Sequence, residues 1–238
     1  MPPGEAPPPS GVDRIGDLPD GVLHHILGFL PAQEAVRTCV LARRWRHLWN
    51  FVTGLRITSW DWQTVVPMHL LLHRGRAPID EFELNLAGLR GSDLELDNLP
   101  VVSRHLAKLE LRDVKFMHSF LDFSSCPVLE HLEIVHCDLS DSNAKKISSQ
   151  SLKHINISRC NFSRTFHTHF YAPNLPSLGL VYYTNRTPVF EDIPLLTEAV
   201  VGVTDESGDW NTCPRFDDSN NCMLPQALSQ AKRLVLKV

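Results

Sequence analysis

The sequence predicts an α/β protein in which a short module of three helices precedes a solenoid of stacked strands that winds as a right-handed superhelix. Three observations lead to this class. Apolar residues recur at helical spacing over residues 13–50, and beyond residue 79 an apolar pattern returns every 23 residues. Hydrophobic residues make up 43% of the 238-residue chain, which is enough for a continuous core.

The N-terminal segment 1–12 is predicted to be disordered, because "MPPGEAPPPSG" holds five prolines in eleven residues. The segment also lacks the apolar h-region of a secretory signal. We therefore expect an intracellular protein of the nucleus or the cytoplasm. In these compartments the six cysteines stay reduced, so a disulfide framework is not expected.

The charge balance gives no reason to expect nucleic acid or a membrane as partner. There are 23 Lys and Arg residues against 27 Asp and Glu residues, which leaves a net charge of -4. No apolar run reaches the roughly 18 residues that a membrane-spanning helix needs. A short basic cluster is interpreted as a solvated face near a helix end; it consists of Arg37, Arg43, Arg44 and Arg46 beside Trp45 and Trp49.

The helical module is predicted over residues 13–50. The first helix has its apolar stripe, with i, i+3, i+4, i+7 spacing, at Leu23, Ile26, Leu27 and Leu30. Pro31 ends this helix, and Pro19 is tolerated in its first turn. Two more helices carry apolar residues at Val36, Cys39 and Val40, and at Leu41, Trp45, Leu48 and Trp49. So small a module cannot bury all of this surface, so an apolar face is expected to remain for a partner.

Residues 51–78 are predicted to join the module to the solenoid. Trp60 and Trp62 are expected to cap the open end of the solenoid, because a terminal repeat must cover apolar surface that no neighbour covers.

The solenoid is predicted over residues 79–238, in units with apolar residues at positions 1, 4, 6 and 9. Four units follow at steps of 23 residues: Leu106, Leu109, Leu111, Val114; Leu129, Leu132, Ile134, Cys137; Leu152, Ile155, Ile157, Cys160; and Leu175, Leu178, Leu180, Tyr183. Looser copies flank them at Ile79, Phe82, Leu84, Ala87, at Leu196, Ala199, Val201, Thr204, and at Ala231, Leu234, Leu236. Pro127, Pro173 and Pro194 precede the first apolar residue of their units, so each unit is read as a turn followed by a short strand.

This pattern is the leucine-rich-repeat signature. Alternate residues of a strand face opposite ways, so the apolar residues point into the coil and their neighbours point out. Stacked units share one core and present a row of strands on the concave side, which is a surface for binding. The candidate contacts there are Lys108, Glu110, Arg112, His131, Glu133, His154 and Asn156.

The cysteines that close two of the units are predicted to be packing residues. Cys137 and Cys160 lie where the chain leaves the strand, and a buried thiol behaves as a small hydrophobe. No metal site is expected. Cys213 and Cys222 have no second pair of ligands, and His167 and His169 would be two ligands without a third.

Two features of the C-terminal part depart from the regular repeat. Residues 205–222 are predicted to form a loop inserted in the last repeat, since they are rich in Asp, Ser, Asn and Gly. Leu234 and Leu236 begin a new strand and no polar capping unit follows, which suggests a shortened chain or a last strand covered by something else.

The stretch "LPDGVLHHILGFLPAQEAVRTCVLARRWRHLW" resembles an F-box, through its Leu-Pro opening, its "ILGFLP" middle and its "RRWRHLW" close. Together with the repeats, the chain is similar to the plant F-box/leucine-rich-repeat proteins. The resemblance implies a substrate-recognition subunit of a Skp–cullin–F-box (SCF) ubiquitin ligase. Its F-box would bind the Skp adaptor, and through it the cullin and RING subunits, while its repeats bind a protein to be ubiquitinated.

Carried over to this chain, the resemblance implies ten adaptor-facing residues, some of which will instead hold the three helices together. They are Leu18, Pro19, Leu23, Ile26, Leu27, Leu30, Pro31, Val36, Val40 and Trp45.

Catalytic chemistry is not expected. The sequence has no phosphate-binding glycine loop, no H-E-x-x-H and no G-x-S-x-G motif, so no catalytic residue and no cofactor is assigned. An adaptor would contribute proximity and orientation alone. The alternative is a leucine-rich-repeat scaffold outside the ubiquitin system, whose F-box-like helices serve only as an N-terminal cap.

Overall fold

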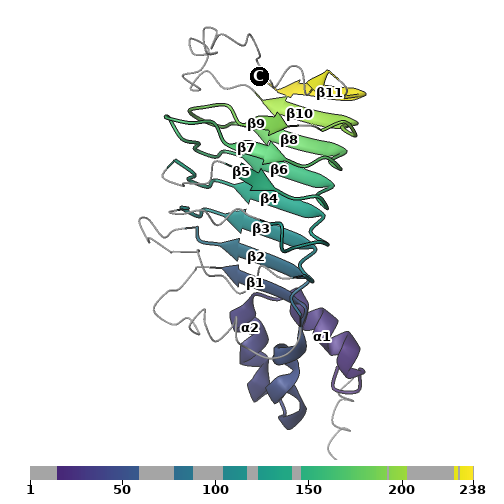
Figure 1. The fold of residues 1–238 in the computed structure, drawn as a ribbon. Helices are drawn as coiled ribbons and strands as arrows, with labels where there is room; N and C mark the ends of the chain where they lie inside the picture. Colours follow the sequence, from purple (N-terminus) through teal and green to yellow (C-terminus); the bar gives the residue numbers. More distant parts are fainter. Residues whose placement is uncertain are drawn as a thin grey trace, which may run out of the picture.

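A computed structural model describes residues 15–58, 78–87, 104–116, 123–140, 146–191, 193–202, 228–229 and 231–237. A bundle of short helices lies at one end, and parallel strands stack away from it in sequence order (Figure 1). The predicted fold class is thereby confirmed. The segment 1–12, Trp60, Trp62 and the loop 205–222 lie outside the described residues.

The helical module is built from α1 (Asp20–Gly28), α2 (Ala32–Arg37) and the 3₁₀ helices η1 (Thr38–Val40) and η2 (Arg43–Phe51). Pro19 and Pro31 are the N-caps of α1 and α2, where a missing N–H costs no helical hydrogen bond. The break predicted at Pro31 is confirmed. The core of the module consists of Leu23, Leu27, Ala35, Trp45, Leu48 and Val52.

Within the described residues, the main sheet has eight parallel strands in the order β1-β2-β3-β4-β6-β8-β10-β11. Their bounds are β1 (Gly54–Thr58), β2 (Glu81–Asn85), β3 (Lys108–Arg112), β4 (His131–Val135), β6 (His154–Ser158), β8 (Ser177–Val181), β10 (Glu198–Gly202) and β11 (Arg233–Lys237). The strands pair in register, so each predicted apolar position lies beside its counterpart, as Leu109 beside Leu132 and Leu132 beside Ile155.

The predicted inward residues are buried. Leu111, Ile134 and Ile157 are all fully buried, and they belong to one continuous core. Burial of each such side chain contributes roughly 2 kcal/mol. One detail differs in the loose copy before the regular units, where Leu86 is buried and the predicted Ala87 is exposed. The longer side chain reaches the core from the neighbouring position.

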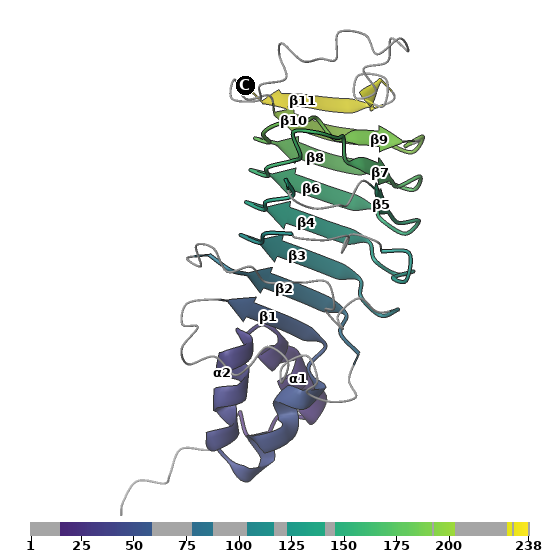
Figure 2. The same cartoon turned by 60° about the vertical axis from the view of Figure 1, so that its left-hand side comes forward.

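A second, three-stranded parallel sheet lies on the other side of the coil: β5 (Lys146–Ser148), β7 (His169–Tyr171) and β9 (Val189–Glu191) (Figure 2). Each strand has one buried residue at its centre, and two of these, Phe170 and Phe190, stack with ring centroids 4.8 Å apart. The return path of these repeats is therefore extended. Strands of three residues are too short for alternation to reveal them in the sequence.

The solenoid begins earlier than predicted. β1 lies within the segment assigned as linker, and it pairs along its whole length with β2. The repeat pattern extends into this segment, because Val52, Leu55 and Ile57 have the same spacing as positions 1, 4 and 6 of the later units. All three residues are buried.

The helical module closes the first coil. Ala32 of α2 belongs to the solenoid core together with Leu55 and Ile57, and Val36 and Trp49 pack against that core. Pro31 forms an isolated parallel bridge with Arg56 of β1. Among the described residues the module itself thus covers the apolar end that terminal repeats must protect.

The chain leaves four strands through the same left-handed turn. The residue after each strand has a positive φ of 54° or 55°: Asp113, His136, Arg159 and Tyr182. The N–H groups of the first three donate to the carbonyl of the next strand, for example His136 to Ser158 at 2.9 Å. The turn extends the ladder of the sheet, which offsets the strain of a non-glycine residue in this conformation.

Candidate functional site

The seven side chains proposed as contacts of the solenoid alternate with the buried residues of β3, β4 and β6. They lie on one surface, the outward face of the main sheet, which we call the open face. Their predicted orientation is confirmed. Because the strands pair in register, the residues at the first, third and fifth strand positions form three rows along the solenoid.

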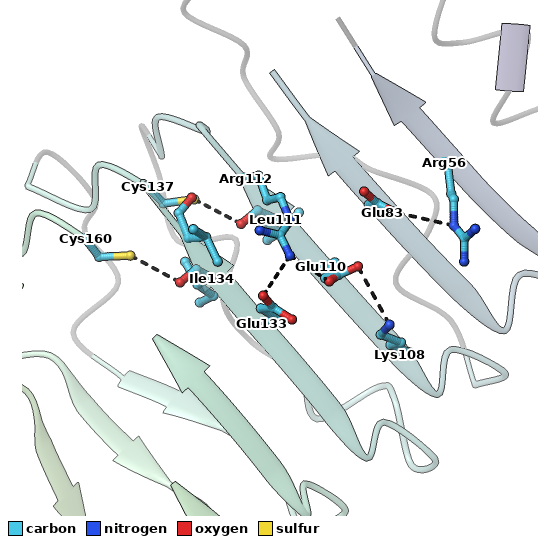
Figure 3. Close-up of polar contacts among 11 residues, drawn as sticks. Arg56, Glu83, Lys108, Glu110, Leu111, Arg112, Glu133, Ile134, Cys137 and Cys160 are labelled. Carbon is cyan, nitrogen blue, oxygen red and sulfur yellow. Dashed lines mark hydrogen bonds and ion pairs between the residues drawn. The ribbon is translucent and has the colours of Figure 1, made fainter. Parts of the chain in front are cut away.

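An ion-pair network covers the N-terminal half of the open face (Figure 3). Arg112 donates to Glu133 on the next strand at 2.8 Å and to Glu110 on its own strand at 3.0 Å. Lys108 lies 3.7 Å from Glu110. Arg56 of β1 extends the network, with its Nε 3.3 Å from Glu83. Most charges in this half of the face are therefore already paired.

The two central carboxyl groups differ in their pKa. Burial raises the pKa of Glu133, and its hydrogen bond to the neighbouring Glu110 raises it further. Burial also acts to raise the pKa of Glu110. The hydrogen bonds of Glu110 with Glu133 and Arg112, together with the charge of Lys108, outweigh the effect of burial and lower the pKa of Glu110. Glu133 therefore takes up the first proton as the pH falls.

Two imidazoles stand next to this network. His131 and His154 occupy the first position of adjacent strands, and their rings stack with centroids 4.6 Å apart and planes inclined by 6°. Partial burial lowers the pKa of His131, and the nearby His154 lowers it further. Two imidazolium cations would repel each other at this distance, so the stack disfavours the charged form of His131.

A groove of about 530 Å³ runs across the open face from β3 to β11. Its middle is lined by small or neutral residues, among them Asn156, Gly179 and Val200. A Cβ on Gly179 would lie 2.7 Å from Oδ1 of Asn156, so a larger residue there would displace that amide and fill the groove. This part of the face can accept a partner without breaking ion pairs.

The repeat cysteines are packing residues, as predicted. Cys137 and Cys160 are each 1% exposed, and their thiols donate to the carbonyl oxygens of Leu111 and Ile134 at 3.4 Å (Figure 3). Burial raises the pKa of the Cys137 thiol well above its usual value. Both groups thus connect one coil to the preceding one as weak donors.

The ten residues proposed for the adaptor fall into three groups. Leu23, Leu27 and Trp45 are buried in the core of the module, and Leu18 and Leu30 pack against that core. These are among the residues that hold the helices together. Pro31 and Val36 lie at the junction with the solenoid. Pro19, Ile26 and Val40 are exposed, so they remain available to a partner.

The helical module exposes other large apolar residues that the sequence analysis did not single out for this role. Leu41 is 67% exposed, and it lies beside the predicted contact Val40, which is 82% exposed. Further exposed apolar side chains of the module are Ile15, Val22, Phe29 and Phe51. Val22 and Ile26 stand one turn apart on the same side of α1. Exposed apolar surface on this scale is typical of a protein-interaction site.

Arg44 has a structural role that the sequence analysis missed. The sequence pattern places it in a solvated basic face, but its guanidinium donates to Asp20 and to the carbonyl oxygens of Gly16 and Leu18. It thereby attaches η2 to the beginning of α1. The contact joins residues 24 to 28 positions apart, so no local sequence pattern indicates it.

The described residues contain no group of three or more His, Cys, Asp or Glu side chains that could hold a metal ion. His167 and His169 each have another partner: the imidazole of His167 contacts Arg186 at 3.0 Å, and that of His169 contacts Glu191 at 2.7 Å. Within the described part of the chain, no helix has the length and apolar character that crossing a membrane requires.

Comparison with known proteins identifies the helical module. The F-box domain family matches residues 15–54. This range contains α1, α2, η1 and η2, and it ends at the first residue of β1. No solved structure matches the chain significantly.

Three relatives from Arabidopsis thaliana extend the match into the repeats. The F-box/LRR-repeat protein At5g02930 is 30% identical over 82% of this chain and 52% of its own length. F-box/LRR-repeat protein 25 is 32% identical over 63% of this chain and 60% of its own. F-box protein At5g03100 is 25% identical over 94% of this chain and 87% of its own length. The chain thus spans about half the length of the first of these relatives.

The F-box match, the relatives that combine an F-box with such repeats, and the register of the stacked strands agree with one another. This chain carries an F-box domain, and with its stacked strands it is similar to the plant F-box/leucine-rich-repeat proteins.

Proposed function

We propose that this protein is the substrate-recognition subunit of an SCF-type ubiquitin ligase. Its helical module binds a Skp-type adaptor, which connects it to the cullin and RING subunits, and its open face binds the protein to be ubiquitinated. The chain contributes proximity and orientation and carries out no chemical step itself. Such a complex would operate in the nucleus or the cytoplasm.

The exposed apolar surface of the F-box module is the observation that carries this proposal. Val40 and Leu41 are among the most exposed large apolar residues of the described chain, and Ile26 and Phe29 add to this surface. Burial of such side chains in a partner is strongly favourable, and adjacent exposed apolar residues are costly to keep without one.

A role as a cap does not compete with adaptor binding. The residues that close the solenoid, Ala32 and Val36, belong to α2, and the exposed pair Val40 and Leu41 belongs to η1 and the turn after it. The module can therefore cover the solenoid with one side and bind an adaptor with another. The scaffold alternative requires only the first contact.

The open face is proposed to bind the target protein mainly through the neutral middle of its groove. A partner that used Glu110 or Glu133 would have to compete with Arg112, which already holds both. The groove around Gly179 requires no such exchange. Interface centres are generally depleted of charge, which agrees with this division.

The test is calorimetric titration of the full chain with a recombinant Skp-type adaptor. We expect binding, and we expect the double variant Val40→Ala/Leu41→Ala to weaken it at least tenfold, because anchor residues are worth about 2 kcal/mol or more. The matched control is Leu234→Ala/Leu236→Ala, a pair also exposed on β11 at the far end of the chain. If the unmodified chain does not bind the adaptor, or both double variants bind it equally well, the scaffold reading replaces this proposal.

A further inference from the structure

The solenoid contains a basic segment between two acidic ones, a feature that the net charge of the chain hides. Residues 80–141 contain thirteen Asp and Glu residues and five Lys and Arg residues. Residues 142–190 contain no acidic residue at all, and six basic ones: Lys145, Lys146, Lys153, Arg159, Arg164 and Arg186. The boundary with the first acidic segment falls between the repeats of β4 and β6.

Three of these cations belong to the turns that follow β6 and β8. Arg159 comes directly after β6, Arg164 lies farther along the same turn, and Arg186 lies in the turn after β8. Arg159 and Arg164 are exposed and Arg186 is half-buried. We call these three residues the basic edge. Adjacent coils are roughly 5 Å apart, so the basic edge is compact along the solenoid axis.

Neutral groups hold these arginines in place. The guanidinium of Arg186 donates to the carbonyl oxygen of Arg164 at 2.9 Å and to His167 at 3.0 Å. Arg164 donates to the side-chain oxygen of Asn185 at 3.3 Å. Arg159 donates to His136 at 3.3 Å and lies over the ring of Tyr182.

The proton positions on the two histidines follow by elimination. A guanidinium can only donate, so Nε2 of His167 accepts from Arg186, and Nδ1 of His167 donates to the carbonyl oxygen of Thr187 at 2.8 Å. His136 likewise accepts through Nε2. Both imidazoles are therefore uncharged acceptors in this arrangement, and they leave the positive charge of the arginines in place.

No described carboxylate forms an ion pair with any arginine of the basic edge. This contrasts with Arg56 and Arg112 on the open face, which are both paired. Arginines whose orientation is fixed by neutral partners lose little freedom when they bind a carboxylate, and their forked geometry suits it. Of the three, Arg159 is linked to the groove through the sheet, because it follows Ser158, whose register partner Val181 lines the groove.

From this arrangement we infer that the basic edge binds a short acidic peptide segment of the target protein, through carboxylates that pair with Arg159, Arg164 and Arg186. The inference rests on the proposed substrate role of the solenoid and names the class of segment that the role requires. A nucleic acid fits less well, since its affinity depends on many phosphate contacts along a strand and the segments on both sides of residues 142–190 are acidic.

The test uses fluorescence anisotropy with the full chain and two labelled twelve-residue peptides, one rich in glutamate and one with glutamine at the same positions. We expect the glutamate peptide alone to bind, with an affinity that falls as salt is added. The single variant Arg164→Gln should lower this affinity about fivefold, as expected for an exposed charge-assisted pair. The triple variant Arg159→Gln/Arg164→Gln/Arg186→Gln should lower it about a hundredfold.

A matched triple variant separates a site from a general effect of charge. Arg37→Gln/Arg46→Gln/Arg233→Gln removes the same number of charges from other places in the chain, and it should leave peptide affinity within about twofold. Circular dichroism checks that the variants are folded, and Arg164→Gln serves as the readout if the triple variant is not.

Three results would overturn the inference: no preference for the glutamate peptide, an equal loss in both triple variants, or tighter binding of a single-stranded RNA of equal charge. Adaptor binding by the same preparations keeps the two proposals apart. An intact adaptor titration with no peptide binding rejects the basic edge alone, whereas a failed adaptor titration rejects the proposed function.

Discussion

The helical module and the solenoid solve the problem of burying apolar side chains in different ways. The solenoid adds one strand per repeat to a single core, so residues such as Leu111 and Ile157 are enclosed by identical positions on both sides. The module has a core of six residues and must share Ala32 with its neighbour. It leaves Val40 and Leu41 in solvent. The apolar side chains of a repeat are covered by the neighbouring repeats. The short helical module needs the surface of a different structure to cover its remaining apolar side chains.

Because of this difference, separate sets of residues serve stability and binding in the solenoid but not in the helical module. In the solenoid strands β3, β4 and β6 the inward apolar residues are buried in the core, and the proposed contacts on the open face are polar. In the module apolar residues serve both purposes. Substitutions should therefore have distinct effects in the two regions, and the following predictions test that division.

The largest effect is expected from truncation inside the solenoid. Leu111→Ala removes a fully buried side chain between two strands and should lower the free energy of unfolding by about 3 kcal/mol. Val40→Ala, at a side chain 82% exposed, should change it by less than about 0.5 kcal/mol. Urea unfolding followed by circular dichroism measures both. Equal losses would mean that the module surface is part of the folding core.

A smaller effect is expected from the contact that joins the two ends of the helical module. Arg44→Gln removes the hydrogen bonds to Asp20 and to the carbonyl oxygen of Leu18, and should cost about 1 kcal/mol, since the side chain is partly exposed. Hydrogen exchange should become faster in α1 and stay unchanged in β6. Arg46→Gln, an exposed neighbour, is the control. Unchanged exchange in α1 would show that Arg44 is not an anchor.

The left-handed turns of the solenoid offer a third comparison. Asp113 has a φ of 55°, which glycine adopts freely and a β-branched residue does not. We expect Asp113→Val to be less stable than Asp113→Gly by about 1 kcal/mol. At Glu130, outside the positive-φ positions, the order of the valine and glycine variants should reverse. Thermal unfolding of the four variants measures the two orders of stability. The same order at both sites would show that the left-handed turn does not determine it.

The smallest expected effect is the pH dependence contributed by the histidine stack. The pKa of His131 is lower in the folded chain than the ordinary value of 6.5, so the unfolded chain binds the proton more readily. This contribution to stability is present above pH 6.5 and is lost as the pH falls below it. His131→Gln should therefore reduce the slope of unfolding free energy against pH between 7 and 5. Gln150→Asn, an exposed substitution that changes no titratable group, should not. A steeper slope in the first variant would contradict the assigned direction.

The sequence by itself determined the architecture and most of the core. The 23-residue period predicts β3, β4, β6 and β8 and the residues they bury, because identical offsets must lie side by side when parallel coils stack. The same alternation correctly assigned the outward direction of Glu110, Glu133 and Asn156. The F-box motif located the helical module, and the match over residues 15–54 confirmed it.

Only the tertiary structure decided which apolar residues of the module are core and which are surface. Leu27 and Ile26 share one helical stripe, yet the first is 1% and the second 42% exposed. The short strands β5, β7 and β9, the cap formed by Ala32 and the contacts of Arg44 also came from the structure. The physical reason is that a sequence period indicates only contacts that recur at a fixed spacing along the chain. These contacts join segments that share no period, and the segments meet only when the solenoid and the helices pack together.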